Sequence, residues 1–487
     1  MNPTKHNAFS AIILLIYGCI VITGIMHHEL WGDELHSWNI AKGSENISLL
    51  FQNIRYEGHP PFWYLCLFTI TRFTHDLDSL KILQACFTIG TAVIILYRSP
   101  FSNLQKVLIL CGYYFVFEYA VLARNYMPAI FFASCIAAIH ITHIRRNAAI
   151  YFLLLFLLSN VHLAGLLLAI SMHAYWCYEK INSGKKNVVS LLPGFLIFLP
   201  SLYFIFPPLD SQLNLQFWME RWNPAQLYLF VTVVVKALFP FPDPANLHWW
   251  NTNLFLDDNS FLFRIISFTL CIFLLGAIIY SLRKSRAALV ILIVNLALTG
   301  LLSLVFPLNS ARYVGFIFIG YLFAAWIAMN KGSQVNRTLF QIILLLQIPA
   351  AAFAFSSELH QKFSTAEKVV ETPGLIKPSA FVATDYWTLN NLSAYMDSSF
   401  YTIELDRKTS FLLWNSEMRA AIHFDYGKGL ISLLEKNKMQ PFYFFSMKNP
   451  EQAASWSQGL KLSLIFFSGP SIERSGEVYL YRIEATE

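Results

Sequence analysis

Long apolar runs recur along most of this chain, separated by short stretches that carry clusters of lysine and arginine. A helix needs about 20 apolar residues to cross the roughly 30 Å hydrocarbon core of a bilayer. The runs that approach this length are 8–26, 82–97, 107–121, 128–144, 148–160, 161–178, 188–206, 261–282, 287–306, 313–329 and 339–355. They predict an α-helical polytopic membrane protein with about 11 transmembrane helices.

The composition favours the same class. Of the 487 residues, 56% are hydrophobic and 13% are charged, whereas a soluble domain carries roughly a quarter charged residues. Aromatic residues reach 16%, as expected where helix ends meet lipid headgroups. Membrane lipids are the expected surroundings. The net charge of +6 says little about nucleic acid, and no nucleic-acid partner is expected, because the basic residues form short clusters between apolar runs, as in cytoplasmic loops of membrane proteins.

Two features of the apolar runs need interpretation. The run 8–26 has the apolar character of a signal peptide, but no small-x-small cleavage site follows it, so we expect it to be the first span. The stretch 148–178 is too long for one span, and the polar residues Asn160 and His162 predict a turn within it. All seven cysteines lie in apolar segments, so no disulfide framework is expected.

The basic clusters predict the orientation of the spans, because cytoplasmic loops are enriched in lysine and arginine. They mark every second loop: Arg98 with Lys106, Arg145-Arg146, Lys180 with Lys185-Lys186, Arg283-Lys284 with Arg286, and Lys331 with Arg337. This alternation places the N-terminus in the cytoplasm. It holds if the shorter segments 60–73 and 226–241 are re-entrant or juxtamembrane helices on the outer side. The loops 27–61, 118–127 and 307–312 then share the outer compartment.

The composition changes near Ser357. Short runs with strand character follow at 380–384, 401–405, 442–447, 462–467 and 478–483, with helical patterns such as 429–438 between them. Alternating strands and helices predict a small α/β domain. We therefore expect a transmembrane domain over 1–356 and an extracytoplasmic domain over 357–487, to which the sequence assigns no chemistry.

The strongest candidate site is Trp31-Gly32-Asp33-Glu34, directly after the first apolar run. Neighbouring carboxylates repel each other, which tends to raise one pKa. A carboxylate in such a place can accept a proton from a hydroxyl group or hold a divalent cation. The alternative is that both acids are solvated in a polar loop, with Trp31 and Trp38 as interfacial anchors.

Further candidates lie in the same outer compartment. His59 stands before two prolines, so the backbone holds it in a rigid turn. Glu118 and Arg124 lie at a depth where ionisable groups are costly and usually functional, and a helix break before Pro128 would let Arg124 turn inward. Arg124 offers a planar fork that suits phosphate; the alternative is that it extends to the surface.

Arg312 lies in Asn309-Ser310-Ala311-Arg312-Tyr313, between two late spans. An arginine on the outer side runs against the positive-inside pattern, so we expect an anionic partner. That partner is the acidic first loop, a lipid headgroup or a bound phosphate.

The order of these motifs resembles glycosyltransferase family 39 of the GT-C superfamily, which includes protein O-mannosyltransferases and aminoarabinose transferases. The matching motifs are Trp-Gly-Asp-Glu after the first span, His-Pro-Pro-x-Trp-Tyr from His59, the loop with Glu118, Arg124 and Tyr126, and a late Arg-Tyr at Arg312. They cover roughly the first 180 residues and, more loosely, the region of Arg312.

The resemblance implies an inverting glycosyltransferase that uses a polyprenyl-phosphate-linked sugar donor and a glycan, lipid or protein acceptor in a bacterial inner membrane. Asp33 matches the catalytic acidic residue of the family and Glu34 its partner. The residues implied in binding substrate or lipid phosphate are His59, Glu118, Arg124, Tyr126 and Arg312. Other members of the superfamily often have an acidic pair where this chain has only Glu118. No cofactor is therefore assigned, and a divalent metal ion stays an open alternative.

Three other functions stay open at this stage. A flippase or transporter of lipid-linked sugars would also place charged residues among spans, although no internal repeat is visible in the sequence. An O-antigen polymerase or ligase also handles lipid-linked sugars, but usually has a large central outer loop. The third alternative is a family member that acts as a non-catalytic scaffold.

Overall fold

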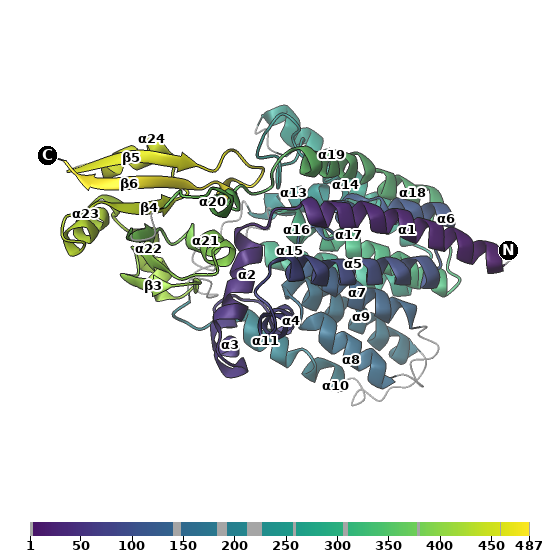
Figure 1. The fold of residues 1–487 in the computed structure, drawn as a ribbon. Helices are drawn as coiled ribbons and strands as arrows, with labels where there is room; N and C mark the ends of the chain where they lie inside the picture. Colours follow the sequence, from purple (N-terminus) through teal and green to yellow (C-terminus); the bar gives the residue numbers. More distant parts are fainter. Residues whose placement is uncertain are drawn as a thin grey trace.

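A computed structural model of the chain describes residues 3–139, 148–182, 192–211, 226–256, 260–304, 310–376, 380–457 and 459–486. Most of the described residues before about 360 are helical, and the described strands all lie beyond that point. The helices form an elongated bundle, and a smaller domain with a β-sheet lies at one end of it (Figure 1). The N-terminus lies at the opposite end of the bundle, because α1 (Pro3–His27) runs along its length.

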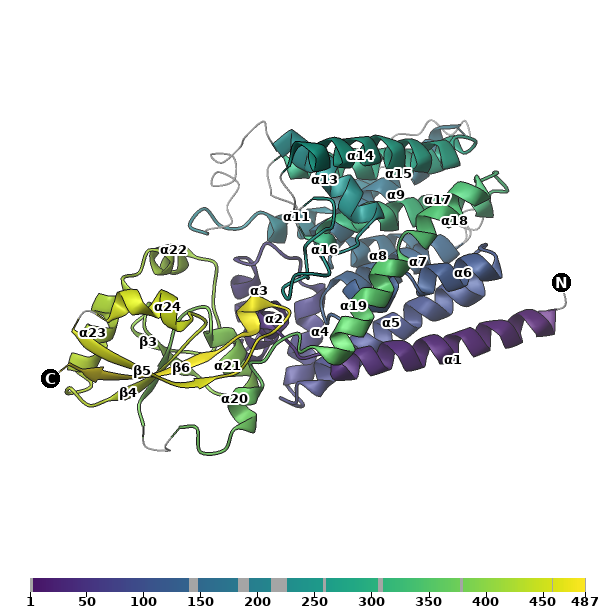
Figure 2. The ribbon, with the colours of Figure 1, turned by 90° about the horizontal axis from the view of Figure 1, so that it is seen from above.

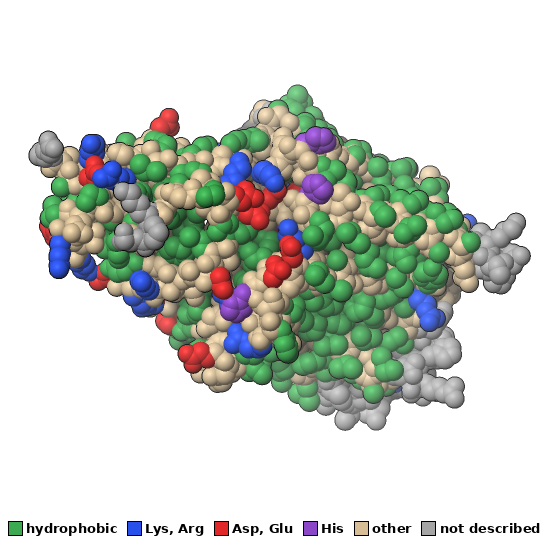
Figure 3. Space-filling model, viewed as in Figure 1, with side chains coloured by type: hydrophobic (Ala, Val, Ile, Leu, Met, Phe, Trp, Pro, Cys, Tyr) green, Lys and Arg blue, Asp and Glu red, His purple; other side chains and the backbone are tan. Residues whose placement is uncertain are grey.

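Six described helical segments are long and apolar enough to cross a membrane. They are Asn7–His27 in α1, Asp78–Arg98 (α5), Phe261–Leu282 (α14), Arg286–Ser303 (α15), Ala311–Asn330 and Arg337–His360. Hydrophobic side chains cover most of the visible face of the bundle, whereas charged side chains gather over the sheet domain and where the two meet (Figure 3). Since water would not tolerate so large an apolar surface, the bundle is a membrane-embedded body.

Within the described residues, none of the other five predicted spans is both long enough and apolar enough, so the count of 11 is not confirmed. The run 107–121 divides into α6 (Asn103–Leu110) and a π-helical turn, η1 (Tyr114–Glu118). The remaining runs contribute α7 (Tyr126–Ala138), α8 (Ala148–Ser159), α9 (Leu163–Asn182), α10 (Leu192–Leu196) and α11 (Leu199–Ile205). Parts of the runs 128–144 and 188–206 lie outside the described residues, as do the basic clusters 145–146 and 185–186.

Proline accounts for two of the interruptions. It occupies the first turn of α11 and of α19 (Ile348–His360), where a missing backbone donor does no harm. The segment Arg337–His360 therefore consists of α18 (Arg337–Leu345) followed by α19. The segment Ala311–Asn330 also consists of two helices. Gly315 separates α16 (Ala311–Val314), which contains Arg312, from α17 (Phe316–Asn330).

Several local predictions are confirmed. The helices α8 and α9 are separated by a turn at residues 160–162, where the sequence has Asn160 and His162. The segments 60–73 and 226–241 form the short helices α4 (Phe62–Thr71) and α13 (Gln226–Leu238). Their side of the membrane stays a prediction. The predicted domain boundary at 356–357 falls inside α19, which continues to His360.

The C-terminal sheet has six strands in the order β3-β2-β1-β4-β6-β5. The central strand β1 (Val382–Thr384) runs parallel to β2 (Phe400–Thr402) and β4 (Phe442–Ser446). The strand β6 (Tyr479–Ala485) pairs antiparallel with β4 on one side and with β5 (Leu460–Phe467) on the other. The sequence predicted these five strands but missed β3 (Arg407–Thr409), because its polar residues form an exposed edge.

Helices cover the sheet and connect it to the bundle. They are α20 (Lys368–Glu371), α21 (Leu389–Tyr395), α22 (Ser416–Ile422), α23 (Tyr426–Lys436) and α24 (Pro450–Ala453). The predicted helix at 429–438 corresponds to α23. Two separate hydrophobic clusters form the interior of the domain, one around Leu430 and Phe444 and the other around Leu389 and Phe445.

The segment after α1 lies between the bundle and the sheet domain. It forms α2 (Gly32–Gly43) and α3 (Ile47–Ile54), and α2 contacts both α4 and α21 (Figures 1 and 2). The side-chain amide of Asn39 donates to the carbonyl of Asn390 at 2.8 Å. The hydroxyl of Tyr395 donates to the carbonyl of Leu30 at 2.8 Å. The first loop is therefore held by both parts of the molecule.

Candidate functional site

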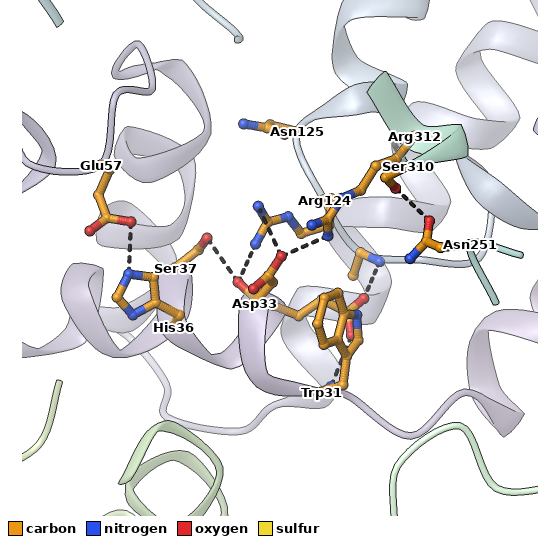
Figure 4. A network of polar contacts seen from close by, with 12 residues as sticks. Trp31, Asp33, His36, Ser37, Glu57, Arg124, Asn125, Asn251, Ser310 and Arg312 are labelled. Carbon is orange, nitrogen blue, oxygen red and sulfur yellow. Dashed lines mark hydrogen bonds and ion pairs between the residues drawn. The ribbon is translucent and has the colours of Figure 1, made fainter. Parts of the chain in front are cut away.

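Asp33 meets two arginines that come from distant parts of the chain. Its Oδ2 accepts a hydrogen bond from Nη1 of Arg312 at 2.6 Å and lies 3.9 Å from Nη2 of Arg124. The guanidinium of Arg124 also donates to the backbone carbonyl of Asp33. Both arginines point at Asp33 at the start of α2 (Figure 4). Three of the predicted site residues thus form one cluster.

Asp33 is an ionised carboxylate that solvent reaches. Burial opposes its charge, but the two guanidiniums outweigh this effect and lower the pKa of Asp33 from 3.8 to about 2. Its place in the first turn of α2 adds the favourable end of the helix dipole. Its side chain is 38% exposed, whereas the two arginine side chains are 15% and 8% exposed. The anion is therefore the accessible member of the cluster.

Aromatic rings hold Arg312 in place. Its guanidinium carbon lies 5.5 Å from the ring centres of Trp31 and Trp250 and 5.0 Å from that of Tyr313. The hydroxyl of Tyr119 donates to the backbone carbonyl of Arg312 at 2.9 Å. A guanidinium enclosed in this way keeps its charge and the direction of its fork. No sequence motif indicated Trp250, which lies far along the chain from the motifs of Asp33 and Arg124.

Arg124 lies in the irregular segment between η1 and α7. The helix break that we predicted before Pro128 is present, because α7 begins only at Tyr126. The break turns Arg124 toward α2. The side-chain amide of the next residue, Asn125, donates to the carbonyl of Val161 and ties this segment to the turn between α8 and α9.

Glu34 faces away from the cluster, although it is adjacent to Asp33 in the chain. Its Oε2 accepts from the backbone N–H of Trp31 at 3.1 Å and from Nε2 of His28 at 3.0 Å. Its Oε1 accepts from the backbone N–H of Ala123. The side chain is fully buried. Both oxygens are thus occupied in capping α2 and anchoring the segment that carries Arg124.

His28 connects Glu34 to the end of α19. Its second nitrogen, Nδ1, lies 2.7 Å from Oε1 of Glu358. Burial disfavours the charged imidazole, but the two carboxylates overcome it and raise the pKa of His28 from 6.5 to about 10. A buried imidazolium between two carboxylates therefore joins the ends of α1, α2 and α19.

His59 follows Gly58, whose φ of 64° lies in the left-handed region, and precedes Pro60. The expected rigid turn is therefore present. Burial and the nearby charge of Arg124 lower the pKa of His59 to about 3, so its imidazole is neutral. Its Nδ1 is buried and has no partner within the described part of the chain.

Glu118 and Tyr126 lie close to the arginines without contacting Asp33. Oε2 of Glu118 accepts from the hydroxyl of Tyr113 at 2.7 Å and from the indole of Trp250 at 3.1 Å. The ring of Tyr126 stacks on Tyr119 with a centroid distance of 5.5 Å. Its hydroxyl is buried and meets no partner among the described residues. The predicted roles of both residues in binding stay predictions.

Two further polar groups lie beside this cluster and were not predicted. Lys236 of α13 donates to the carbonyl of Asn251, and the side chain of Asn251 accepts from the hydroxyl of Ser310. The signal for Lys236 was a single cation in an apolar run. The second group is the pair of His36 and Glu57. His36 follows Glu34 closely in the sequence and Glu57 lies just before His59, but neither residue was assigned a role. Asn309 lies outside the described residues.

The donor set around Asp33 does not fit a divalent metal ion. Two guanidiniums already neutralise Asp33, and their charge would repel a cation. Within the described ranges, no group of three or more His, Cys, Asp or Glu side chains is arranged to hold a metal ion.

A scan against protein-family models and a search of curated proteins each found no match for this chain.

Proposed function

We propose that this protein is a membrane-embedded glycosyltransferase. It moves a sugar from a polyprenyl-phosphate donor to a hydroxyl group of an acceptor, at the end of the bundle next to the sheet domain. The observation that carries the proposal is the cluster of Asp33, Arg124 and Arg312, in which one accessible carboxylate lies against two buried, permanently charged guanidiniums.

The two arginines suit the donor. The phosphate of a lipid-linked sugar lies at the headgroup level, where a membrane-embedded bundle meets water, and its tail needs an apolar surface beside it. A guanidinium binds phosphate through parallel hydrogen bonds. Negative charge grows on this phosphate as the bond to the sugar breaks, so fixed cations stabilise the transition state more than the bound substrate.

The two arginines would also control how strong a base Asp33 is, because Asp33 forms an ion pair with Arg312. A carboxylate with a pKa of about 2 is a weak base. When a donor phosphate binds the arginines, they interact less with Asp33, and its pKa rises. Asp33 thus becomes a better proton acceptor only when the donor is in place.

The reaction is then a single displacement with inversion at the anomeric carbon. The acceptor hydroxyl gives its proton to Asp33, and its oxygen forms the new bond to the anomeric carbon. The bond from this carbon to the phosphate oxygen breaks, and its electron pair leaves with the polyprenyl phosphate. Glu34 positions Asp33 by capping α2, and no step needs a metal ion.

The topology inferred from the basic clusters supports an outward-facing site. In this proposal the N-terminus is cytoplasmic, the sheet domain is extracytoplasmic and the protein belongs to a bacterial inner membrane with about 11 spans. The motif order supports membership of glycosyltransferase family 39. Reporter fusions at the C-terminus test the topology, and a cytoplasmic reporter signal would exclude this orientation.

The activity is tested with Asp33→Asn in membranes that contain the variant at wild-type abundance. We expect sugar transfer from a polyprenyl-phosphate donor to fall by at least about 100-fold, because a general base contributes that much. Asp76→Asn, a change at an exposed acid in the turn before α5, is the matched control and should retain transfer. Full activity of Asp33→Asn would remove Asp33 as the base. Movement of the donor across the membrane without a covalent product would support the flippase alternative.

A further inference from the structure

A second polar group surrounds His36, one helical turn along α2 from Asp33. Nε2 of His36 lies 2.7 Å from Oε2 of Glu57, and Nδ1 lies 3.3 Å from the side-chain oxygen of Asn390. Burial disfavours the charged ring, but Glu57 outweighs this effect and raises the pKa of His36 above its usual range. Glu57 comes from the loop before α4, whereas Asn390 belongs to α21 of the sheet domain.

The two carboxylate oxygens of Glu57 differ in their hydrogen bonding. Its Oε2 is shared by His36 and the hydroxyl of Tyr64, at 2.7 and 3.4 Å. Its Oε1 is buried and meets no partner in the described part of the chain, and the side chain is 3% exposed. A buried carboxylate oxygen without a donor is costly. A ligand that brings a hydroxyl group to this point would satisfy it.

Two tryptophans of the sheet domain, Trp414 and Trp387, lie near His36. The ring of Trp414 lies 6.3 Å from that of His36 and nearly perpendicular to it, and the ring of Trp387 lies 6.2 Å from Trp414. Both indoles are only half-buried. The hydroxyl of Ser211 donates to the carbonyl of Trp414 at 2.8 Å, which fixes this segment against the bundle. The backbone of Trp414 is therefore held in place, and Trp387 lies next to its ring.

We propose that His36, Glu57, Asn390, Trp387 and Trp414 form a carbohydrate-binding subsite, so that the acceptor is a sugar ring. A sugar ring presents C–H groups that pack on indole faces, together with neighbouring hydroxyls. Those hydroxyls donate to a carboxylate and accept from an imidazolium or an amide. The assignment of this subsite to the acceptor rests on the proposed function, whereas carbohydrate binding itself does not.

The position of the group agrees with this assignment. In Figure 4 Asp33 lies between the arginines on one side and the pair of His36 and Glu57 on the other. In an inverting displacement the acceptor and the leaving phosphate approach the reacting carbon from opposite sides, and binding must hold both. A base between an anion site and a hydroxyl site satisfies this requirement. The sheet domain thereby gains a role in choosing the acceptor.

The test measures binding of methyl glycosides of a hexose and an N-acetylhexosamine to the full chain in lipid nanodiscs, by saturation-transfer NMR and tryptophan fluorescence. We expect saturable binding by the wild type, weakened at least about tenfold in Glu57→Gln and Trp414→Ala, the size expected for one hydrogen bond to a charged group or one ring contact. Glu57→Gln keeps the shape of the side chain and guards against a folding defect in Trp414→Ala. Tyr401→Ala removes a half-buried aromatic of β2 outside the group, and it should bind as the wild type does.

Each result decides a different point. Unchanged binding in both Glu57→Gln and Trp414→Ala, or no saturable binding by the wild type, overturns the subsite. Binding of a serine- and threonine-rich peptide in place of the glycosides also overturns it and indicates a polypeptide acceptor. If the glycosides bind as expected but no donor sugar is transferred to any acceptor, the proposed function fails while the carbohydrate site stands. In a transfer assay, Trp414→Ala should raise the KM for the acceptor and leave the KM for the donor unchanged.

Discussion

Nη1 of Arg312 lies 2.6 Å from Oδ2 of Asp33, although 279 positions separate the two residues in the chain. The contact joins the start of α2 to the start of α16, and both elements lie near the end of the bundle that carries the sheet domain (Figure 2). Because the guanidinium is enclosed by Trp31, Trp250 and Tyr313, its direction is fixed before any ligand binds. The predictions below follow from this preorganised pair and from the residues that support it.

Arg312→Lys should lower sugar transfer at least about tenfold while the protein still folds. Lysine keeps the charge but loses the planar fork and the stacking on aromatic rings. The measurement is kcat/KM for a polyprenyl-phosphate sugar in nanodiscs. Arg283→Lys is the matched control, because Arg283 follows α14 and its guanidinium stacks on Tyr280, away from Asp33. Equal activity of the two variants would contradict a role for the guanidinium fork.

The two pH profiles of the reaction should differ on the acid side. The profile of kcat/KM reports the free enzyme, in which the pKa of Asp33 is about 2, whereas that of kcat reports the enzyme with bound substrate. We expect kcat/KM to show no acid limb from Asp33 above about pH 4, and kcat to fall at a higher pH, because the donor phosphate draws the arginines away. Coincident acid limbs would exclude this exchange of partners.

Because of His28, the stability of the protein should fall as the pH becomes alkaline. Its pKa is about 10 in the folded protein and 6.5 in its usual range. A raised pKa contributes stability that is fully present below about pH 6.5 and is lost as the pH rises through about 10. The measurement is the thermal midpoint in nanodiscs from pH 6 to 10.5, for the wild type and for His28→Gln.

The difference between these two midpoints should shrink as the pH rises. At neutral pH His28→Gln should cost about 3–5 kcal/mol, because it leaves Glu34 and Glu358 buried without their cation. A difference that does not change with pH would show that His28 is uncharged in the folded protein.

Gly315→Ala should disturb the support of Arg312. A Cβ atom at this position would collide with the ring of Tyr114 and with the hydroxyl of Tyr119, which donates to the carbonyl of Arg312. We expect a loss of about 1–3 kcal/mol in the free energy of unfolding, together with reduced transfer. Gly276→Ala is the control, since a Cβ atom there meets nothing within 4 Å. Normal activity and stability of Gly315→Ala would mean that the tyrosines move aside freely.

The sequence predicted those features that depend on local pattern. The apolar runs indicated a membrane-embedded helical bundle, and alternating short strands indicated the C-terminal domain. The helix break before Pro128 also followed from local chemistry. The basic clusters predicted that the first loop, Arg124 and Arg312 share one side of the membrane, and the acidic first loop was one of three partners expected for Arg312.

Features that depend on contacts between distant residues could not be predicted in this way. Nothing in the sequence near Glu34 indicates that His28 and the N–H of Ala123 occupy its carboxylate. The same holds for Trp250, which covers Arg312 from a loop far along the chain. Short or interrupted helices such as η1 were not predicted. Inside a bundle, neighbouring parts of the protein can satisfy an irregular backbone, so a segment at membrane depth need not be one long helix.

The docking of α2 against α21 has a consequence for the synthesis of the protein. Asn39 and Lys42, in the same helix as Asp33, bond to residues of the sheet domain that the ribosome makes about 350 residues later. Glu358, which completes the contact with His28, also comes late. The contacts that hold α2 and His28 in place are therefore completed only after the sheet domain has been made and has folded.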